Sequence, residues 1–552
     1  MKESQCIECK QKFTINDGDT AFYKRIDVPD SKRCPECRLI RRLTFRNTKT
    51  LYYRKCDLTG KRIISQYHKD VPFPVYGVEA WWGDSWDALD YGRDFDFGRP
   101  FFEQYLELEN ATPHFSAFII GGTLENSEFT NCTGYIKNCY LIAESDYDED
   151  CYYSNRLNES RNVCDSSFVY GGELCYDCMD CRDCYNLKYS RDSRNCGDSA
   201  FLSNCQECRD CIGCINQRHK QYMVFNKQYS REEYEKMKSD FKIDTYSGVC
   251  KLQKKCNEFF LTQPYKNIQA EHNENCIGDH LYDSKNCFYC YDSKDLEDCR
   301  YCFRLFLTVK NSMDYSGWGA GSELVYECGA CGDHAYNIKF CANCTTNVVD
   351  CEYCQQCTSS KDLFGCVGLK KKQYCIFNKQ YTKDEYFALK EKIIAHMKQT
   401  GEYGEFFSAN VSAFGYNETI AQDCFPLTKD QALAKGYKWK DADEKASVPA
   451  TIEIPENVKD AKDSMVNEVL ICSNCGKNYK IIEQELRLYR QMAVPIPHFC
   501  PSCRHIKRMG LRGMAHLWRR KCNRCSEDMM TSFAPDRPEI VYCEKCYLEE
   551  VY

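Results

Sequence analysis

The spacing of hydrophobic residues predicts a small number of short helices in this chain. After Cys37, the positions Leu39, Arg42/Leu43 and Arg46 have the spacing of an amphipathic helix with a basic face. Phe101, Tyr105 and Leu108 would share one face of another helix. Further helices are expected after the capping residues Ser230, Thr382 and Thr428, the last one ending at Gly436, and over residues 483–489.

The middle of the chain, about residues 116–400, has a different pattern, in which cysteine recurs in steps of three. The clearest steps are Cys175, Cys178, Cys181, Cys184 and Cys205, Cys208, Cys211, Cys214. Cysteines also recur at a longer interval, because Cys175 and Cys196 are the same number of residues apart as Cys184 and Cys205. A repeat of about 20 residues, rich in Tyr, Phe, Asn and Ser, predicts the coils of a β-solenoid.

Asparagine often precedes cysteine in this region, as in Asn138-Cys139, Asn195-Cys196 and Asn204-Cys205. Asparagine tolerates the left-handed backbone conformation that solenoid corners need, and its amide can stack on an equivalent amide. We therefore expect these asparagines at the corners of the coils.

A larger duplication divides the cysteine-rich region into two blocks. Residues 225–234 (FNKQYSREEY) reappear 152 positions later as residues 377–386 (FNKQYTKDEY). Each copy contains a capping box that starts a helix rich in Lys and Glu. The predicted fold is therefore mainly β, with a β-solenoid in two duplicated blocks, residues 116–245 and 246–400, each closed by a helix.

The central cysteines have three interpretations from the residues alone. They can pack inward as small apolar side chains, which is the interpretation we favour. They can instead bind further zinc or an iron–sulfur cluster, since Cys-x2-Cys-x2-Cys resembles ferredoxin ligation, although no Cys-Pro follows it here. Ladders of disulfides are the third interpretation.

The amino-acid composition indicates the cellular compartment in which the protein is expected. The 552 residues include 43 cysteines, a density typical of disulfide scaffolds or metal-rich proteins. The first residues contain no apolar segment of a secretory signal, and no run of about 18 apolar residues predicts a membrane span. Reduced thiols in the cytoplasm are therefore expected.

Both ends of the chain carry paired Cys-x2-Cys motifs, the spacing of a four-cysteine zinc ribbon. The first set is Cys6, Cys9, Cys34 and Cys37, and adding 466 to each number gives the second set, Cys472, Cys475, Cys500 and Cys503. A third set follows at Cys522, Cys525, Cys543 and Cys546. Its N-terminal counterparts are Cys56, Thr59, Gly77 and Ala80, so that position should be metal-free. We expect three zinc ions.

The two ends are also basic, whereas the net charge of the whole chain is −7. Residues 125–215 hold seventeen Asp/Glu against eight Lys/Arg. The cations near the zinc motifs are candidates for contacting nucleic-acid phosphates, with aromatic residues interleaved for stacking on bases. They are Arg38, Arg41, Arg42, Arg46, Arg54, Lys55, Arg504, Lys507, Arg508, Arg512, Arg519, Arg520 and Lys521.

Three functions are compatible with these features. The leading hypothesis is a non-enzymatic zinc protein whose basic ribbons bind nucleic acid, RNA slightly ahead of DNA. The alternative for these cations is a solvated basic face, or one that docks on the acidic solenoid of the same chain. The second hypothesis is a protein-interaction scaffold with structural zinc ribbons and an extended solenoid surface. An iron–sulfur or redox protein is the third hypothesis. No pair of nucleophile and base stands out, so no catalytic residue or small-molecule substrate is predicted.

The motif Cys-x2-Cys-Gly-Lys-x-Tyr, followed by Glu-Gln-Glu-x3-Tyr and Cys-Pro-x-Cys-Arg, resembles a bacterial zinc-ribbon domain family without an established activity. The matching ligand positions are Cys472, Cys475, Cys500 and Cys503. The whole chain resembles uncharacterised cysteine-rich zinc-ribbon proteins of small-genome uncultivated bacteria. This resemblance implies zinc and a bacterial cytosol. The predicted domains are an N-terminal zinc-ribbon module (1–115), the two blocks, a small segment with linker (401–465) and a double zinc ribbon (466–552).

Overall fold

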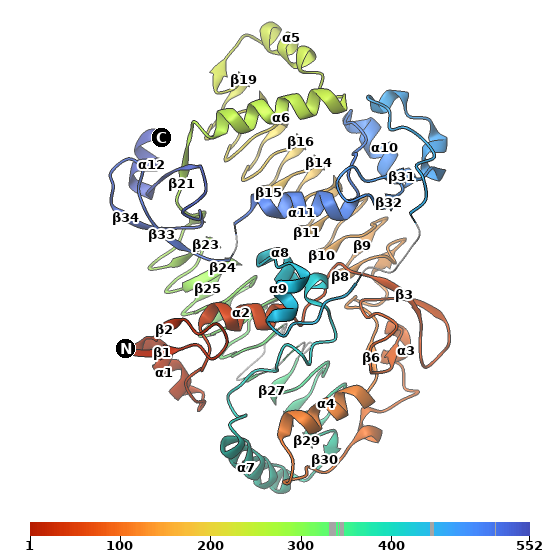
Figure 1. The fold of residues 1–552 in the computed structure, drawn as a ribbon, viewed down its shortest axis with the longest axis vertical. Coiled ribbons are helices and arrows are strands. Elements are labelled where there is room, and N and C mark those ends of the chain that lie inside the picture. Colours follow the sequence, from red (N-terminus) through yellow and green to blue (C-terminus); the bar gives the residue numbers. More distant parts are fainter. Residues whose placement is uncertain (330–337, 341, 343–346, 442–446, 514, 552) are drawn as a thin grey trace. The chain divides into compact units, whose positions relative to one another are not determined.

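The computed structural model describes residues 1–329, 338–340, 342, 347–441, 447–513 and 515–551. Strands account for 27% of the chain and helices for 25%, so the predicted sheets are present but helices are nearly as abundant. The chain forms two compact units. Unit 1 consists mainly of Met1–Ala117 and Ile268–Lys440, and unit 2 of Phe118–Asn267, Asp441–Gly513 and Trp518–Tyr552. Each unit thus joins one terminal segment to one part of the cysteine-rich middle (Figure 1).

Unit 2 contains two ladders of short parallel strands. The first consists of β8 (Asn131–Gly134), β10 (Ala143–Asp146), β11 (Asn155–Asn158), β13 (Ser167–Tyr170) and β15 (Met179–Arg182). The second consists of β12 (Arg161–Cys164), β14 (Glu173–Tyr176), β16 (Tyr185–Lys188), β17 (Gly197–Ala200), β18 (Arg209–Ile212) and β19 (Gln221–Val224). β20 (Lys227–Gln228) pairs with β19 in the antiparallel direction. β7 (Leu124–Glu125) and β9 (Ile136–Lys137) form a separate parallel pair. Strands in both ladders pair at an offset of 12 residues, as Cys175 does with Leu187.

A left-handed residue at nearly every third position explains this offset. Asp177, Asp180 and Asp183 have φ angles of 51°, 52° and 52°. Asn and Asp adopt this conformation more readily than other non-glycine residues. The left-handed conformation expected of these asparagines is confirmed at Asn138 and Asn195, which both have φ of 52°. Four three-residue steps return the chain to the same ladder, so the longer spacing predicted from the cysteines alone is wrong.

The residue after most left-handed positions is directed into a core between the two ladders. Cys178 and Cys181 are fully buried there together with Leu187. Ser190 occupies an equivalent place, and its hydroxyl donates to the Lys188 carbonyl (2.8 Å) and accepts from the Leu202 N–H (2.9 Å). Thiols in this core likewise donate to backbone carbonyls of a neighbouring turn, Cys178 to that of Leu187 at 3.3 Å. The predicted inward packing is confirmed for these cysteines.

Unit 1 contains corresponding parallel ladders. Its strands are β22 (Ala270–Glu271), β23 (Ile277–Tyr282) and β24 (Phe288–Lys294), then β25 (Leu296–Glu297) with β26 (Val309–Lys310), and β27 (Val349–Glu352), β28 (Lys361–Phe364) and β29 (Gln373–Ile376) with β30 (Lys379–Gln380). Val349 pairs with Lys361, which is the same ladder offset as in unit 2. The buried interior includes cysteines such as Cys290 and Cys351.

Helices close both blocks, as predicted from the capping boxes. In unit 2, α5 (Arg231–Phe241) and α6 (Tyr246–Phe260) cover the end of the second ladder, with Tyr234 and Leu252 buried against Ile212 and Val224. In unit 1, α7 (Lys383–Thr400) follows β30. The capping boxes of Ser230 and Thr382 are both formed, which confirms these helix starts.

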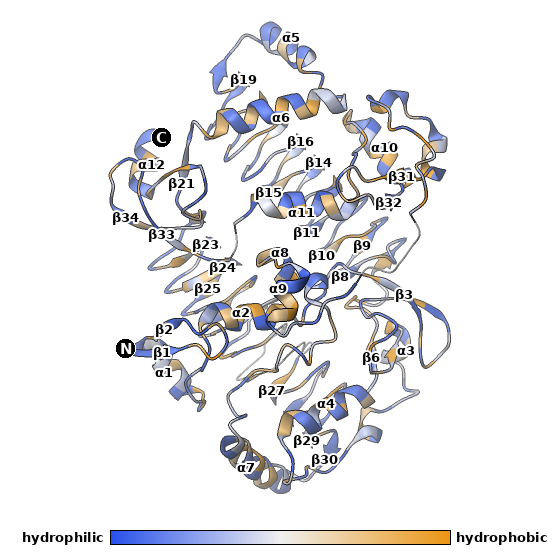
Figure 2. Ribbon diagram, viewed as in Figure 1, coloured by the Kyte–Doolittle hydropathy of each residue, from blue (hydrophilic) through white to orange (hydrophobic). Residues whose placement is uncertain are grey.

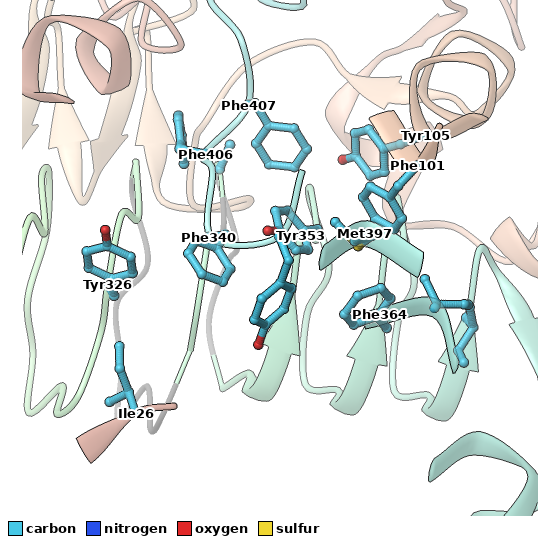
Figure 3. Packing of buried hydrophobic residues seen from close by; sticks show 14 of the residues in the cluster. Ile26, Phe101, Tyr105, Tyr326, Phe340, Tyr353, Phe364, Met397, Phe406 and Phe407 are labelled. Carbon is cyan, nitrogen blue, oxygen red and sulfur yellow. The ribbon is translucent and has the colours of Figure 1, made fainter. Parts of the chain in front are cut away.

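Aromatic side chains pack the outer face of the unit 1 ladders against the terminal segment. Phe340 stacks on Tyr353 with ring centroids 5.0 Å apart, and Phe364 lies beyond Tyr353 (Figure 3). Phe101 from α4 (Phe101–Ala111) and Phe407 contact the same row. The predicted helix around Phe101 is therefore confirmed, and its apolar face is fixed by the cysteine-rich block.

The terminal segments have matching element orders. The N-terminal one contains β1 (Lys2–Gln5), β2 (Lys12–Ile15), α1 (Asp17–Arg25), α2 (Pro35–Leu43), β3 (Tyr52–Lys55), β4 (Arg62–Ser65), β5 (Val75–Tyr76), α3 (Val78–Trp82) and, after α4, β6 (His114–Phe115). The C-terminal one contains β31 (Leu470–Ile471), β32 (Asn478–Tyr479), α10 (Glu483–Met492), α11 (Pro501–Leu511), β33 (Trp518–Lys521), β34 (Asp528–Thr531), β35 (Ile540–Tyr542), which pairs with β21 (Pro264–Lys266), and α12 (Glu544–Val551). Between α7 and β31 lie α8 (Ile420–Cys424) and α9 (Lys429–Ala434).

Candidate metal centres and the basic helices beside them

The three sets of four cysteines predicted from sequence each come together in space. They are Cys6, Cys9, Cys34 and Cys37; Cys472, Cys475, Cys500 and Cys503; and Cys522, Cys525, Cys543 and Cys546. Within each set the four sulfurs all lie within 4.8 Å of one another. Each of the pairs Cys9–Cys34, Cys475–Cys500 and Cys525–Cys543 is separated by 3.8 Å. Four thiolates at about 2.3 Å from a tetrahedral metal ion would be about 3.8 Å apart, so the donor sets fit such an ion.

The first cysteine pair of each set lies on a tight turn that presents both sulfurs. The Cys472 N–H donates to the Lys477 carbonyl, and the Cys472 carbonyl accepts from the Gly476 N–H. Gly476 has φ of 69°, the left-handed conformation in which glycine is unstrained. Ser526 has φ of 63° at the matching position of the third set. The backbone of the turn therefore fixes where the two sulfurs of the pair lie.

Backbone N–H groups directed at sulfur favour the thiolate form in these turns. Burial opposes ionisation of Cys472, but N–H donors led by that of Cys500 lower its pKa to about 6. The pKa of Cys522 is lowered to about 6 in the same way, with N–H groups of Cys525 and Cys543 as donors. Zinc binds thiolates, so these sulfurs are prepared for metal binding near neutral pH.

The fourth turn, at Cys56, keeps this geometry without the other three thiols. The sulfur of Cys56 accepts hydrogen bonds from the N–H groups of Thr59 (3.4 Å) and Gly77 (3.3 Å). Gly60 has the same left-handed conformation as Gly476, with φ of 70°. Packing supports the segment, because the Trp81 ring is fully buried beside Phe115. The turn at Cys56 is thus held by hydrogen bonds and aromatic packing.

The helices that begin at the second cysteine pair of the first two sets, α2 and α11, direct arginines into the cysteine-rich block of their own unit. In unit 1, the Arg38 guanidinium is 2.7 Å from one carboxylate oxygen of Asp314. Arg42, one helical turn later on α2, is 3.1 Å from the other oxygen. All three side chains are at most 2% exposed. Both α2 and α11 carry hydrophilic and hydrophobic stretches (Figure 2), and the basic face is the buried one.

Unit 2 repeats this arrangement with different residues. Arg504 on α11 is 2.8 Å from one oxygen of Asp165, and Arg508 is 3.3 Å from the other. Subtracting 466 carries Arg504 and Arg508 onto Arg38 and Arg42. Asp165 and Asp314 both occupy left-handed positions, with φ of 51° and 57°. Two arginines one helical turn apart hold a single buried aspartate in both units, and we call this arrangement the arginine clamp.

Neighbouring ion pairs extend each clamp. Arg41 is 2.6 Å from Glu327, a buried pair in unit 1. Arg512 in unit 2 lies 2.9 Å from Asp180, with its guanidinium 3.7 Å from the centre of the Phe168 ring. Burial of such charges is costly unless they are paired and hydrogen-bonded. Each clamp therefore fixes its helix in one position on the block.

The thirteen predicted nucleic-acid residues do not form one exposed surface. Five are buried, four are half-buried and four are exposed. The buried ones are Arg38, Arg41, Arg42, Arg504 and Arg508; the half-buried ones are Arg46, Arg54, Arg512 and Arg520; and the exposed ones are Lys55, Lys507, Arg519 and Lys521. The most basic segments thus contact acids of the same chain, the arrangement expected of a basic face that docks on the acidic middle.

Sequence reasoning missed the acids of the clamps. Asp165 is 343 residues from Arg508 and Asp314 is 272 residues from Arg42, so no local motif includes them. The signal that could have located Asp165 is the recurrence of acids in left-handed positions at the ladder offset, as Asp177 follows Asp165.

Comparison of this chain with protein-family models, with curated proteins and with solved structures finds no match. None of the helices in the described residues is long and apolar enough to cross a membrane.

Proposed function

We propose that this chain is a non-enzymatic protein-interaction scaffold, in which zinc-bound ribbons hold basic helices on two blocks of a β-solenoid. The arginine clamp is the observation that carries this proposal. Its arginines are common to both ribbons, yet Arg42 and Asp314 are both fully buried. These buried charges stabilise the fold of the chain. The outer surface of the blocks is then the surface available for partners.

The solenoid part of the proposal rests on the strand register. In unit 2, parallel strand pairing at one offset and a left-handed residue at nearly every third position are what a four-sided coil of three-residue sides would give. In unit 1 the offset varies, since Ala270 pairs with Leu281 and Leu296 pairs with Val309. Successive coils would build an extended surface, which suits binding of other proteins in a reduced compartment such as the cytoplasm.

Zinc is the metal we assign to the three ribbon sets. Four-thiolate tetrahedral sites are typical of structural zinc, and such sites keep no open position for a reaction. In the C-terminal ribbon, Cys500 and Cys503 flank the start of α11, and Arg504 follows directly. Zinc would therefore fix the helix end from which the clamp extends.

Exposed aromatic residues on unit 2 give the scaffold a testable surface. Tyr135 and Tyr147 stack with ring centroids 4.8 Å apart, and their residues are 51% and 57% exposed. Exposed tyrosines are favoured anchors at protein interfaces, because they bury a large area at low entropic cost.

The test is capture of partners by tagged, zinc-loaded protein from nuclease-treated native lysate. A defined protein partner should be retained, and the Tyr135→Ser/Tyr147→Ser variant should lose it, whereas the exposed Lys507→Ala control should keep it. Loss of every partner after nuclease treatment would refute the scaffold proposal.

Nucleic-acid binding is a second candidate, favoured by the exposed cations of the C-terminal ribbon. Arg519 and Lys521 lie on the hairpin formed by β33 and β34, beside Trp518, and Lys507 is exposed on α11. Cations of this kind neutralise phosphates while an aromatic ring stacks on an unpaired base.

The measurement is the affinity for single-stranded RNA, then DNA, across a salt series. Binding through these cations predicts that each Lys507→Ala, Arg519→Ala or Lys521→Ala change lowers the salt slope by about one. The clamp variant Arg508→Met should leave the slope unchanged. Affinity that does not vary with salt would exclude this function.

A further inference from the structure

A later segment of unit 1 covers α2 and the residues that follow it. We call residues 403–425 the covering segment. The Phe45 ring lies against those of Phe406 and Phe407 in this segment, with ring centroids 5.4 Å and 6.1 Å apart. Phe45 is therefore buried, with only 3% of its surface exposed.

Charge and a hydrogen bond to the backbone also hold the covering segment on α2. The Arg41 guanidinium is 3.4 Å from the Glu405 carboxylate, which directly precedes the two phenylalanines. The Ser412 hydroxyl donates to the Thr44 carbonyl at 2.7 Å. The first ribbon is thus covered by an acidic residue, two aromatic residues and a hydroxyl from elsewhere in its own unit.

The corresponding part of α11 in unit 2 is exposed. Subtracting 466 carries Leu511 onto Phe45 and Lys507 onto Arg41. Leu511 is 51% exposed, and Ile506, which precedes Lys507, is 65% exposed. Lys507 is exposed as well. Within the described parts of the chain, no segment buries these side chains as the covering segment buries Phe45.

The backbone of α11 is open to approach at the same place. Gly510 corresponds to Thr44, whose carbonyl accepts the hydrogen bond from the covering segment. A Cβ at Gly510 would meet open space, because no atom lies within 4 Å of that position. We call Ile506, Lys507, Gly510 and Leu511 the α11 face. It offers apolar surface, a cation and accessible backbone, the three kinds of contact that the covering segment makes on α2.

We propose that the α11 face docks a segment of a partner protein in which an acidic residue precedes two aromatic residues. This inference rests on the scaffold function proposed above and names a second surface of unit 2 and the chemistry of its partner. The aromatic rings bury Ile506 and Leu511, as the covering segment buries Phe45, and the carboxylate lies beside Lys507.

The experiment measures binding of a fluorescein-labelled peptide with the sequence of residues 403–414 to the full zinc-loaded chain by fluorescence anisotropy. The attached covering segment keeps α2 occupied, because its effective concentration is high. Wild type should bind saturably, and Ile506→Ser/Leu511→Ser should bind at least about tenfold more weakly, since docking buries both side chains. The control Leu261→Ser/Leu548→Ser changes residues that are 40% and 44% exposed elsewhere in unit 2, and it should bind as wild type does.

Changes in the peptide separate the apolar contact from the charged one. Phe406→Ala/Phe407→Ala in the peptide should abolish binding to the wild-type chain. Glu405→Gln in the peptide should weaken binding to wild type by about two- to fivefold and leave binding to the Lys507→Ala chain unchanged. These measurements on the wild-type chain decide the question if the double serine variant fails to fold.

Three results would overturn the proposal. The first is no saturable binding of the peptide, and the second is equal binding by wild type and Ile506→Ser/Leu511→Ser. The third is a wild-type dimer that this double change makes monomeric, because a second copy would then cover the α11 face. If the peptide fails to bind while the partner that depends on Tyr135 and Tyr147 is still captured, the scaffold function stands and only the α11 face is refuted.

Discussion

Replacing Arg504 by methionine tests the arginine clamp directly. The guanidinium lies 2.8 Å from Asp165 and 3.4 Å from Glu485, and these acids are 1% and 0% exposed. It also donates to the Tyr489 hydroxyl at 2.9 Å. Methionine keeps much of the volume of the side chain but leaves two buried carboxylates with one cation fewer.

Removing one partner of a buried ion pair costs about 3–5 kcal/mol. Because Arg508 still lies 3.3 Å from Asp165, we expect the lower end, about 3 kcal/mol. In a unit of this size 1 kcal/mol shifts the melting temperature by about 2–4 °C, so Arg504→Met should melt about 6–12 °C lower.

The assay is thermal unfolding of the zinc-loaded chain, with Lys507→Met as the matched control. Lys507 is exposed on the same helix, so its replacement should change stability by less than about 0.5 kcal/mol. Asp165→Asn combined with Arg504→Met should destabilise less than the sum of the single changes, by about 1 kcal/mol or more. Equal melting temperatures of Arg504→Met and Lys507→Met would refute the stabilising role of the clamp. The basic residues of α11 would then again be candidates for binding nucleic acid.

Three further predictions concern other parts of the chain. Cys475→Ser should reduce the zinc content, measured by elemental analysis, from three ions per chain to two, because one complete ligand set loses a thiolate. Burial raises the pKa of Glu109 to about 8 from its usual 4.5, so its ionisation destabilises the fold increasingly from about pH 4.5 to pH 8. Glu109→Gln should therefore have the same free energy of unfolding as wild type near pH 4.5 and be more stable than wild type at pH 8 by up to about 5 kcal/mol. Denaturant titrations at the two pH values measure this difference. Equal stability of variant and wild type at both pH values would contradict the raised pKa. Cys181→Ser should lower the free energy of unfolding by less than about 1.5 kcal/mol, since serine fills similar core positions. A larger loss of stability would show that this thiol has a role that a hydroxyl cannot replace.

Local features of the sequence predicted local structure well. The Cys-x2-Cys spacing located every ribbon ligand, because one tight turn fixes two sulfurs whatever surrounds it. Capping boxes located the starts of α5 and α7, since the bonds of Ser230 and Thr382 involve residues three positions away. These structures are decided by residues that are neighbours in the chain.

The offset between paired strands was harder to obtain from the sequence, although the three-residue step was visible. One ladder offset after Cys175 stands Leu187, and one offset after Cys178 stands Ser190. Cysteine does recur at the true offset, as in Cys184 and Cys196, but thiol, hydroxyl and aliphatic side chains all suit the core, so residues such as Leu187 and Ser190 interrupt the series. The separation from Cys175 to Cys196 is seven steps of three, which leads to a different side of the ladder pair.

No repeat offset in the sequence joins the acids of the two clamps, because the block offset of 152 carries Asp165 onto Gly317 rather than Asp314. The offset of 466 that relates the two ribbons does not relate Asp165 to Asp314. The N-terminal ribbon contacts the second block and the C-terminal ribbon contacts the first, each within its own unit. A shared clamp at both places requires that a change in one partner be matched in a segment far away in the chain. The buried arginines common to the two ribbons are therefore accounted for by an interaction within the chain. Any external partner has to be sought among exposed residues, such as Lys507, which stands where the other ribbon has the buried Arg41.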